Sequence, residues 1–85
     1  MLVEEIKQLL QDGIPDAVFK VTGEGENFSV DVISAAFENT SRLNRQKKVL
    51  SCVKEQIAAG QIHAFSVQTF TQEEWDRNIN SLTVL

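Results

Sequence analysis

Reactive and structure-breaking residues are scarce in this chain. It has one cysteine, one histidine and one proline among 85 residues. A single cysteine cannot close an internal disulfide, so Cys52 fits a reducing compartment, and we expect a cytoplasmic protein. A single histidine cannot complete the tetrahedral ligand set of a zinc site. Any metal bound by His63 would therefore need ligands from a second molecule.

Long apolar runs are also missing, so the sequence predicts no membrane segment. The first ten residues, MLVEEIKQLL, lack a basic start and a cleavage-like site, which argues against a secretory signal. The net charge of −4 argues against a dedicated nucleic-acid binder, which is usually basic. One small domain is expected at this length, without a deep cleft. Because no set of nucleophile, base and orienting group can be assembled, we expect no enzyme.

Hydrophobic periodicity predicts the element order α-β-β-α-β-α. The expected helices cover about 2–12, 42–59 and a short stretch around Trp75, and a further helical turn is expected at 35–37. The expected strands cover 17–22, 28–33 and 62–70, with a turn-forming loop over 23–27. Thr40 or Ser41 caps the long helix, while Thr71 and Glu74 form a capping box for the last one. We expect 78–85 to be a tail that frays.

These elements predict an α+β fold with two layers. The first two strands form an antiparallel hairpin, and the long helix makes a right-handed crossover to a parallel third strand. The three-stranded mixed sheet then has both main helices on one face. A helical wheel predicts that the long helix turns an apolar stripe towards the sheet, formed by Leu43, Leu50, Val53 and Ile57. It places four residues on the opposite side, namely Arg45, Lys48, Cys52 and Glu55.

His63 stands at the start of the third strand and is the main candidate for chemistry. Imidazole can bind a metal, move protons or sense pH. One interpretation is a metal ligand at a partner interface; the other is a partly buried histidine bonded to a backbone carbonyl. We expect the ring to be reachable by solvent and to border both the hairpin tip and the basic start of the long helix.

That basic start holds four of the eight basic residues of the chain, namely Arg42, Arg45, Lys47 and Lys48. Cations at a helix N-terminus oppose the helix dipole, which favours a purpose such as binding phosphate, nucleic acid or an anionic partner. The alternative is a solvated helix face. Cys52 is interpreted as a small, half-exposed filler, because it has no neighbouring base or resolving thiol in the sequence.

Three segments together resemble the BolA family. They are the hairpin loop before Phe28 with Ala35-Ala36-Phe37 after it, the basic stretch RLNRQKKVL at 42–50, and IHAFSV at 62–67 followed by TQEEW at 71–75. Their order and spacing are similar to that family over residues 1–77. The short acidic hairpin is most similar to its bacterial IbaG-like branch.

The resemblance implies a class II KH-like fold without the GxxG loop of true KH domains. It also implies a non-enzymatic adaptor, a monomer alone, that forms a heterodimer with a monothiol glutaredoxin. In such heterodimers a [2Fe–2S] cluster is shared by a glutaredoxin cysteine, glutathione and BolA side chains. This role lies in cluster assembly, trafficking or iron sensing.

The family's invariant histidine ligand matches His63. The family's second ligand, a His or Cys in the hairpin loop, matches Asn27. Asparagine is a poor iron ligand, and the neighbouring Glu24 and Glu26 are hard oxygen donors, so this chain departs from the family pattern there.

The resemblance also implies contacts to other macromolecules. Arg42, Arg45 and Lys48 would bind the partner together with His63. Part of the family is described as DNA-binding regulators, and a regulator of the stress response is the alternative function. In that case the binding residues would be Arg42, Arg45, Lys47 and Lys48.

Overall fold

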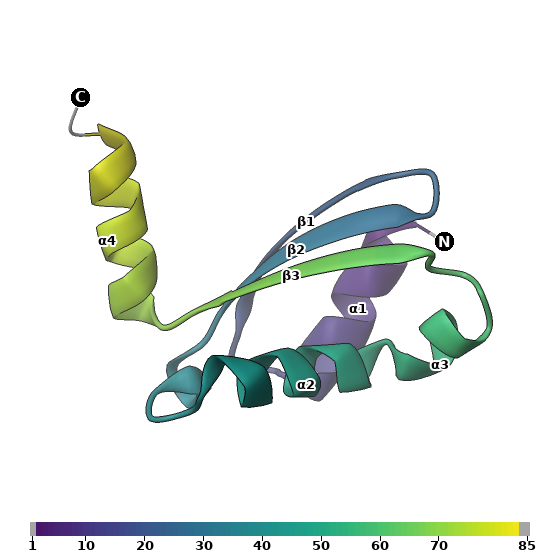
Figure 1. Ribbon diagram of the computed structural model, residues 1–85, viewed down its shortest axis with the longest axis horizontal. Coiled ribbons are helices and arrows are strands. Elements are labelled where there is room, and N and C mark those ends of the chain that lie inside the picture. Colours follow the sequence, from purple (N-terminus) through teal and green to yellow (C-terminus); the bar gives the residue numbers. More distant parts are fainter. Residues whose placement is uncertain (1, 84–85) are drawn as a thin grey trace.

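The chain folds into two layers, a three-stranded sheet and the helices that cover one of its faces (Figure 1). The computed structural model describes residues 2–83, apart from the side chains of 24 and 78–83. The elements are α1 (Val3–Gly13), β1 (Val18–Glu24), β2 (Asn27–Ile33), the 3-10 turn η1 (Ala35–Phe37), α2 (Arg42–Cys52), α3 (Lys54–Ala58), β3 (Ala64–Phe70) and α4 (Gln72–Thr83). The predicted α+β class and the turn at 35–37 are confirmed.

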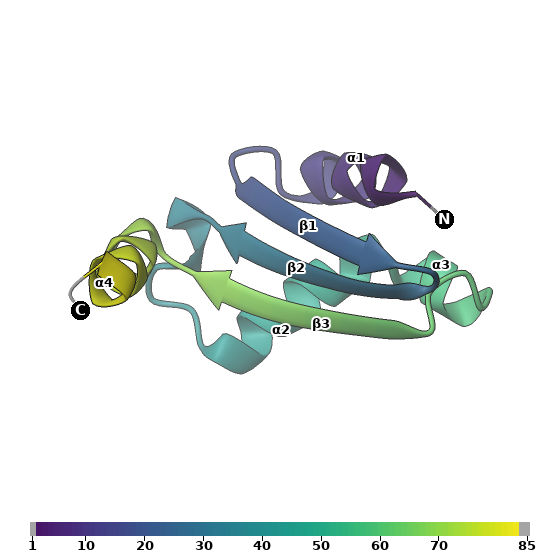
Figure 2. The same ribbon diagram turned by 90° about the horizontal axis from the view of Figure 1, so that it is seen from above.

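The sheet has the strand order β1-β2-β3, with β1 and β2 antiparallel and β2 and β3 parallel, as predicted (Figure 2). The hairpin is tighter than expected. Glu24 pairs directly with Asn27, so the turn consists of Gly25 and Glu26 rather than five residues. Gly25 has a φ of +64°, which a residue without Cβ adopts at no cost. Asn27 is therefore the first residue of β2 and not part of a loop.

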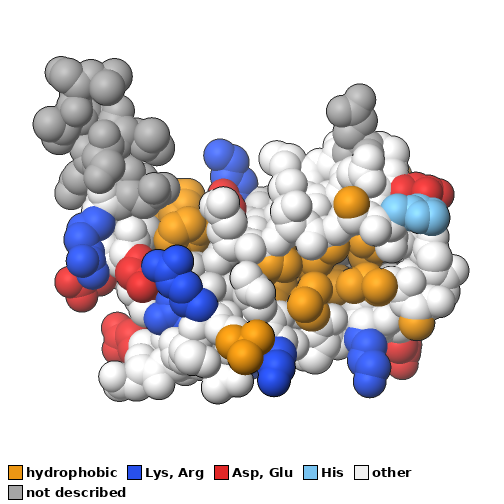
Figure 3. Space-filling model, viewed as in Figure 1, with side chains coloured by type: hydrophobic (Ala, Val, Ile, Leu, Met, Phe, Trp, Pro, Cys, Tyr) orange, Lys and Arg blue, Asp and Glu red, His pale blue; other side chains and the backbone are white. Residues whose placement is uncertain are grey.

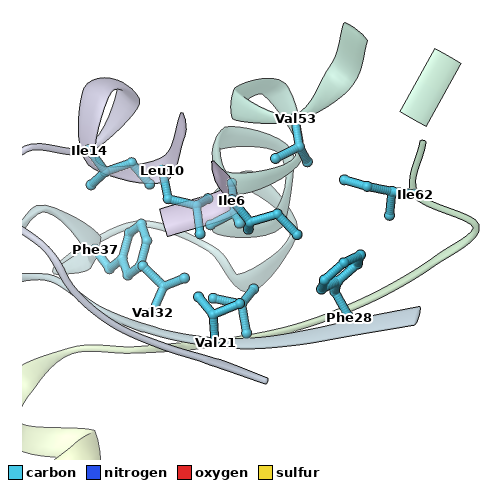
Figure 4. Close-up of a cluster of buried hydrophobic side chains, with 11 residues drawn as sticks. Ile6, Leu10, Ile14, Val21, Phe28, Val32, Phe37, Val53 and Ile62 are labelled. Carbon is cyan, nitrogen blue, oxygen red and sulfur yellow. The ribbon is translucent and has the colours of Figure 1, made fainter. Parts of the chain in front are cut away.

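The core lies between the sheet and the helices α1 and α2 (Figure 4). Because side chains alternate along a strand, one face of the sheet supplies a continuous apolar layer. From β2, the fully buried core side chains are Val30 and Val32. From the helices and turns, the fully buried core side chains are Ile6, Leu10, Ile14, Phe37, Val49 and Val53. Phe65 and Val67 of β3 pack against this cluster and stay half-buried. Their predicted inward direction is confirmed.

The predicted single helix over 42–59 is wrong, because the chain breaks at Val53 into α2 and α3. Ser41 caps α2 by accepting a hydrogen bond from the Asn44 N–H at 3.2 Å. Of the two predicted caps, Thr40 and Ser41, the structure therefore uses Ser41. The predicted inward stripe is confirmed at Val53, which is fully buried, and wrong at its other three members. Leu43 is 62% exposed and Ile57 is 39% exposed.

The buried residues of α2 are Arg45 and Val49, neither of which belongs to the predicted stripe. The Arg45 guanidinium donates to Glu74 Oε1 at 2.7 Å and lies 5.8 Å from the centre of the Phe37 ring. An arginine stem packs like an aliphatic chain while its charge is paired. A helical wheel that ranks residues by polarity places such an arginine on the solvent side. For this reason the predicted orientation of α2 was wrong.

Helix α4 begins with the predicted capping box. The Glu74 N–H donates to Thr71 Oγ1 at 3.2 Å, and the Thr71 N–H donates to Glu74 Oε1 at 2.7 Å. Trp75 packs edge-on against Phe70 with ring centres 5.2 Å apart, which fixes α4 to the end of β3. The helix continues to Thr83, so most of the expected tail over 78–85 is helical, and 84–85 lie outside the described residues. No helix within residues 2–83 is long and apolar enough to cross a membrane.

Candidate functional site

The backbone at His63 is tied to the tip of the hairpin. The N–H of His63 donates to the carbonyl of Glu26 at 3.0 Å, and the N–H of Ala64 donates to the same oxygen at 3.4 Å. Ala64 is paired with Asn27 in the parallel ladder, so the histidine stands one residue before the strand begins. The histidine therefore has a fixed backbone at an open end of the sheet.

The side chain of His63 is paired with a carboxylate. Its Nε2 lies 2.6 Å from Glu26 Oε2, and the two side chains are 62% and 59% exposed. The interpretation of a partly buried histidine bonded to a carbonyl is therefore wrong, and the expected solvent access and contact with the hairpin tip are confirmed. Figure 3 shows the ring beside acidic oxygens at the right-hand rim. A neutral imidazole that donates from Nε2 has its lone pair on Nδ1.

Asn27, the position that matches the family's loop ligand, is on the other face of the sheet. It precedes the buried Phe28, so alternation sends its side chain outwards. There it lines a shallow depression together with Thr22, Ser29 and Ser66. The residue that the structure brings to His63 is Glu26. The contact between Glu26 and His63 depends on the tight turn and on the strand register. The predicted five-residue loop did not contain that information.

The basic start of α2 is not next to His63, contrary to the expectation. Arg42 and Gln46 line a groove along the last four residues of β3, 67–70. In a parallel crossover the helix starts near the strands' carboxyl ends and runs back to their amino ends, where His63 lies (Figure 1). The histidine thus faces the end of the crossover, and the first turn of α2 lies at the far end of the sheet.

The four basic candidates have different surroundings. Arg42, Lys47 and Lys48 are exposed, whereas the side chain of Arg45 is only 8% exposed and bound to Glu74. An arginine in this position stabilises the fold and has little surface to offer a ligand. Of the predicted contact residues, the structure therefore leaves Arg42, Lys47 and Lys48 free to meet another molecule.

Cys52, the last residue of α2, is half-buried and lies against the end of α1. Its thiol donates to the Lys48 carbonyl at 3.4 Å, and it fills the space beside Gly13. Burial raises the pKa of the Cys52 thiol, and the smaller opposing effects of Ser51 and Lys48 do not offset it. A thiol that stays protonated is a poor nucleophile, which fits the predicted role as filler.

The described residues contain no cluster of three or more His, Cys, Asp or Glu side chains that could hold a metal ion. This part of the chain can therefore offer single ligands only. His63 offers an imidazole nitrogen, and Glu26 offers a carboxylate oxygen at its side. A soft iron–sulfur centre accepts imidazole in place of thiolate.

Comparison with known proteins agrees with this fold. The profile of the BolA family, described as BolA-like protein, matches residues 6–74. The acid stress protein IbaG of Escherichia coli strain K12 is 33% identical over 78 residues, which are 89% of this chain and 93% of that protein. The chain therefore belongs to the BolA family, as its sequence segments predicted.

Solved structures extend the likeness to three dimensions. A BolA protein homologue from Coxiella burnetii superposes with a TM-score of 0.79 at 27% identity, over 91% of this chain and 99% of that one. The solution structure of yeast Fra2 gives a TM-score of 0.71 at 29% identity, over 100% and 95% of the two chains. The sheet and helices that position His63 are thus those of the family.

Proposed function

We propose that this BolA-family protein is a non-enzymatic adaptor that binds a monothiol glutaredoxin and takes part in [2Fe–2S] cluster handling. In this role His63 supplies one nitrogen ligand to a cluster whose other ligands come from the partner and from glutathione. The observation that carries the proposal is the exposed imidazole, held by Glu26 at an open end of the sheet. A single oriented nitrogen suits a shared centre, because one ligand cannot retain a cluster alone.

Glu26 acts as the positioning residue in this proposal. Histidine ligands commonly donate their other ring N–H to a carboxylate, which fixes the tautomer and raises the basicity of the ligating nitrogen. In this chain Nε2 meets Glu26, so Nδ1 is the nitrogen offered to iron. When bound, the cluster supplies redox or transfer chemistry, and the protein supplies the ligand and its orientation.

The test combines the purified chain with a cluster-loaded monothiol glutaredoxin and follows visible absorption and circular dichroism. We expect a change in the cluster bands with the natural chain and none with His63→Ala. Asn27→Ala is the matched control, because Asn27 lies on the other face, and it should behave like the natural chain. Equal spectra and affinity for His63→Ala and the natural chain would remove His63 as a ligand.

Nucleic-acid binding is the alternative function. Arg45, one of its four candidate residues, is paired with Glu74 and has little exposed surface for DNA. It would rest on Arg42, Lys47 and Lys48. It requires an affinity that falls steeply with salt and weakens on charge reversal at Lys47 or Lys48. A titration with double-stranded DNA at two salt concentrations separates it from the adaptor, which needs no such dependence.

A further inference from the structure

The outer edge of β3 has free backbone groups. The Ala64 N–H donates towards β2, to Glu26, and the Phe70 carbonyl accepts from the Ser34 N–H at 3.0 Å. Since both groups of a strand residue point to the same side, the even-numbered residues of β3 face β2. The N–H and C=O groups of Phe65, Val67 and Thr69 therefore point away from the sheet.

Leaving aside the undescribed side chains of 24 and 78–83, no protein group within residues 2–83 bonds these outward N–H and C=O groups. Figure 2 shows β3 as the outermost strand, with α2 below it and neither α1 nor α4 alongside. Three unbonded donor–acceptor pairs in a row can each bond a strand laid beside them.

The edge also lacks the usual protection against pairing. Natural edge strands carry lysine, proline or bulges that discourage a second strand. The opposite edge strand, β1, has Lys20 near its middle. In contrast β3 reads AFSVQTF, without any charged residue, proline or glycine. An unprotected edge of high β-propensity in a folded domain is a sign that a strand binds there.

The surface around this edge indicates the chemistry of the partner. Arg42 and Gln46 border the groove along the second half of β3. Lower on the same face, Lys47 and Lys54 flank a hollow floored by the half-exposed side chains of Leu50 and Ile57. No acidic residue lines either hollow, and hydrophobic side chains gather between them (Figure 3). The surface below this edge is therefore apolar around Leu50 and Ile57 and carries the basic residues Arg42, Lys47 and Lys54, while the acidic Glu26 lies apart from both hollows, at the hairpin tip.

A second copy of the chain would not complement this face. Two copies paired edge to edge about a two-fold axis would place the same basic side chains, those of Arg42, Lys47 and Lys54, on both sides of the seam. An acidic segment meets opposite charge instead, at no cost in like-charge repulsion.

We propose that the free edge of β3 binds an extended acidic segment of a partner protein by strand addition. Backbone groups of the segment bond Phe65, Val67 and Thr69, alternate apolar side chains cover the apolar face, and a carboxylate pairs with Arg42. This inference is independent of His63, iron and glutaredoxin, and it is tested without them.

The probe is the acetylated peptide amide EVTVEVE, added to isotope-labelled protein in an NMR titration. We expect amide exchange to slow about tenfold at Phe65, Val67 and Thr69, which corresponds to about 1.4 kcal/mol of added protection. Exchange at Ser66 and Gln68, whose amides already bond β2, should change little. The same peptide with N-methyl groups on alternate residues keeps the charge and loses the backbone bonds, and it should not bind.

Three variants and one further peptide complete the test. Arg42→Glu should weaken binding of the acidic peptide about tenfold and favour the peptide KVTVKVK. Val67→Pro removes an outward N–H that the sheet does not use, and it should abolish binding while Ser66→Ala has no effect.

Three results would overturn the proposal: equal response to the N-methylated peptide, no protection at millimolar peptide, or protection of these amides by self-association without peptide. The last result would identify a second copy as the occupant. None of these outcomes bears on His63, so failure here leaves the adaptor proposal standing, and the reverse also holds.

Discussion

Arg45 of α2 and Glu74 of α4 are joined across 29 positions of sequence by a hydrogen bond of 2.7 Å from Nη1 to Oε1. The same Glu74 oxygen accepts from the N–H of Thr71. One carboxylate therefore closes the cap of the last helix and neutralises a buried guanidinium. This pair links the helix that follows β3 to the crossover helix.

Replacement of Glu74 by glutamine should destabilise the fold by about 2 kcal/mol, because a charged hydrogen bond is lost and Arg45 stays buried. Chemical denaturation measures the loss. Glu73→Gln is the control, since Glu73 is 80% exposed and pairs only with the exposed Arg77. Equal destabilisation by the two substitutions would contradict a special role for Glu74.

The Glu74 pair also predicts how stability depends on pH. The backbone hydrogen bond from Thr71 and then the contact with Arg45 lower the pKa of Glu74 below its usual 4.5. A carboxyl group with a lowered pKa in the folded state contributes stability above its unfolded pKa, and loses it as pH falls through the folded value. The natural chain should thus lose stability below about pH 4.5 more steeply than Glu74→Gln. Parallel acid-unfolding curves for the two proteins would disprove this account.

Gly13 and Cys52 predict a reversal of sign. Gly to Ala within a helix normally stabilises by about 0.5–1 kcal/mol. Here a Cβ on Gly13 would overlap the Cys52 sulfur, so Gly13→Ala alone should destabilise by about 1–3 kcal/mol. In a Cys52→Ala background the sulfur is gone, and Gly13→Ala should then stabilise. Thermal unfolding of the four proteins in this cycle measures the coupling, and additive effects would contradict the contact.

The exposed and buried faces of α2 predict effects of different size when two apolar residues are replaced by alanine. Leu43→Ala should change the free energy of unfolding by less than about 0.5 kcal/mol, because Leu43 is 62% exposed. Val49→Ala should cost about 2 kcal/mol, because Val49 is fully buried. A larger cost at Leu43 than at Val49 would restore the helix orientation that the wheel suggested.

The pair of His63 and Glu26 predicts a tautomer. In the neutral ring, long-range proton–nitrogen NMR should show the proton on Nε2 and a bare Nδ1. Glu26→Gln keeps the length of the side chain but can present an N–H₂ group, so the preference for this tautomer should fall. Glu38→Gln, an exposed change far from the ring in the sequence, serves as control. A ring that carries its proton on Nδ1 in the natural chain would reject the assignment of the ligating nitrogen.

Much of the fold could be predicted from local patterns. The alternation in Phe28, Val30 and Val32, together with the turn-forming glycines, gave the hairpin. A long helix between two strands gave the parallel partner. The orientation of α2 could not be predicted, because it depends on a salt bridge between Arg45 and a residue beyond β3. Spacing within one helix carries no information about that partner.

The candidate site was predicted in part for the same reason. His63 stood out as the only histidine, and its place before an alternating strand made it an edge residue. The role of Glu26 depended on the length of the turn, because one residue of register exchanges the faces of Glu26 and Asn27. The distance of the basic helix start from His63 follows from the parallel crossover, which the predicted topology already contained.

The hairpin tip is anchored to β3 through the carbonyl oxygen of Glu26, which accepts from two successive amides. Main-chain atoms are the same whatever residue occupies positions 26 and 27. Side chains at these two positions can therefore be exchanged while the backbone of His63 stays in place, and a cysteine or histidine at 26 would face the ring directly. Substitutions at the hairpin tip can therefore introduce harder or softer metal ligands without any change in the rest of the domain.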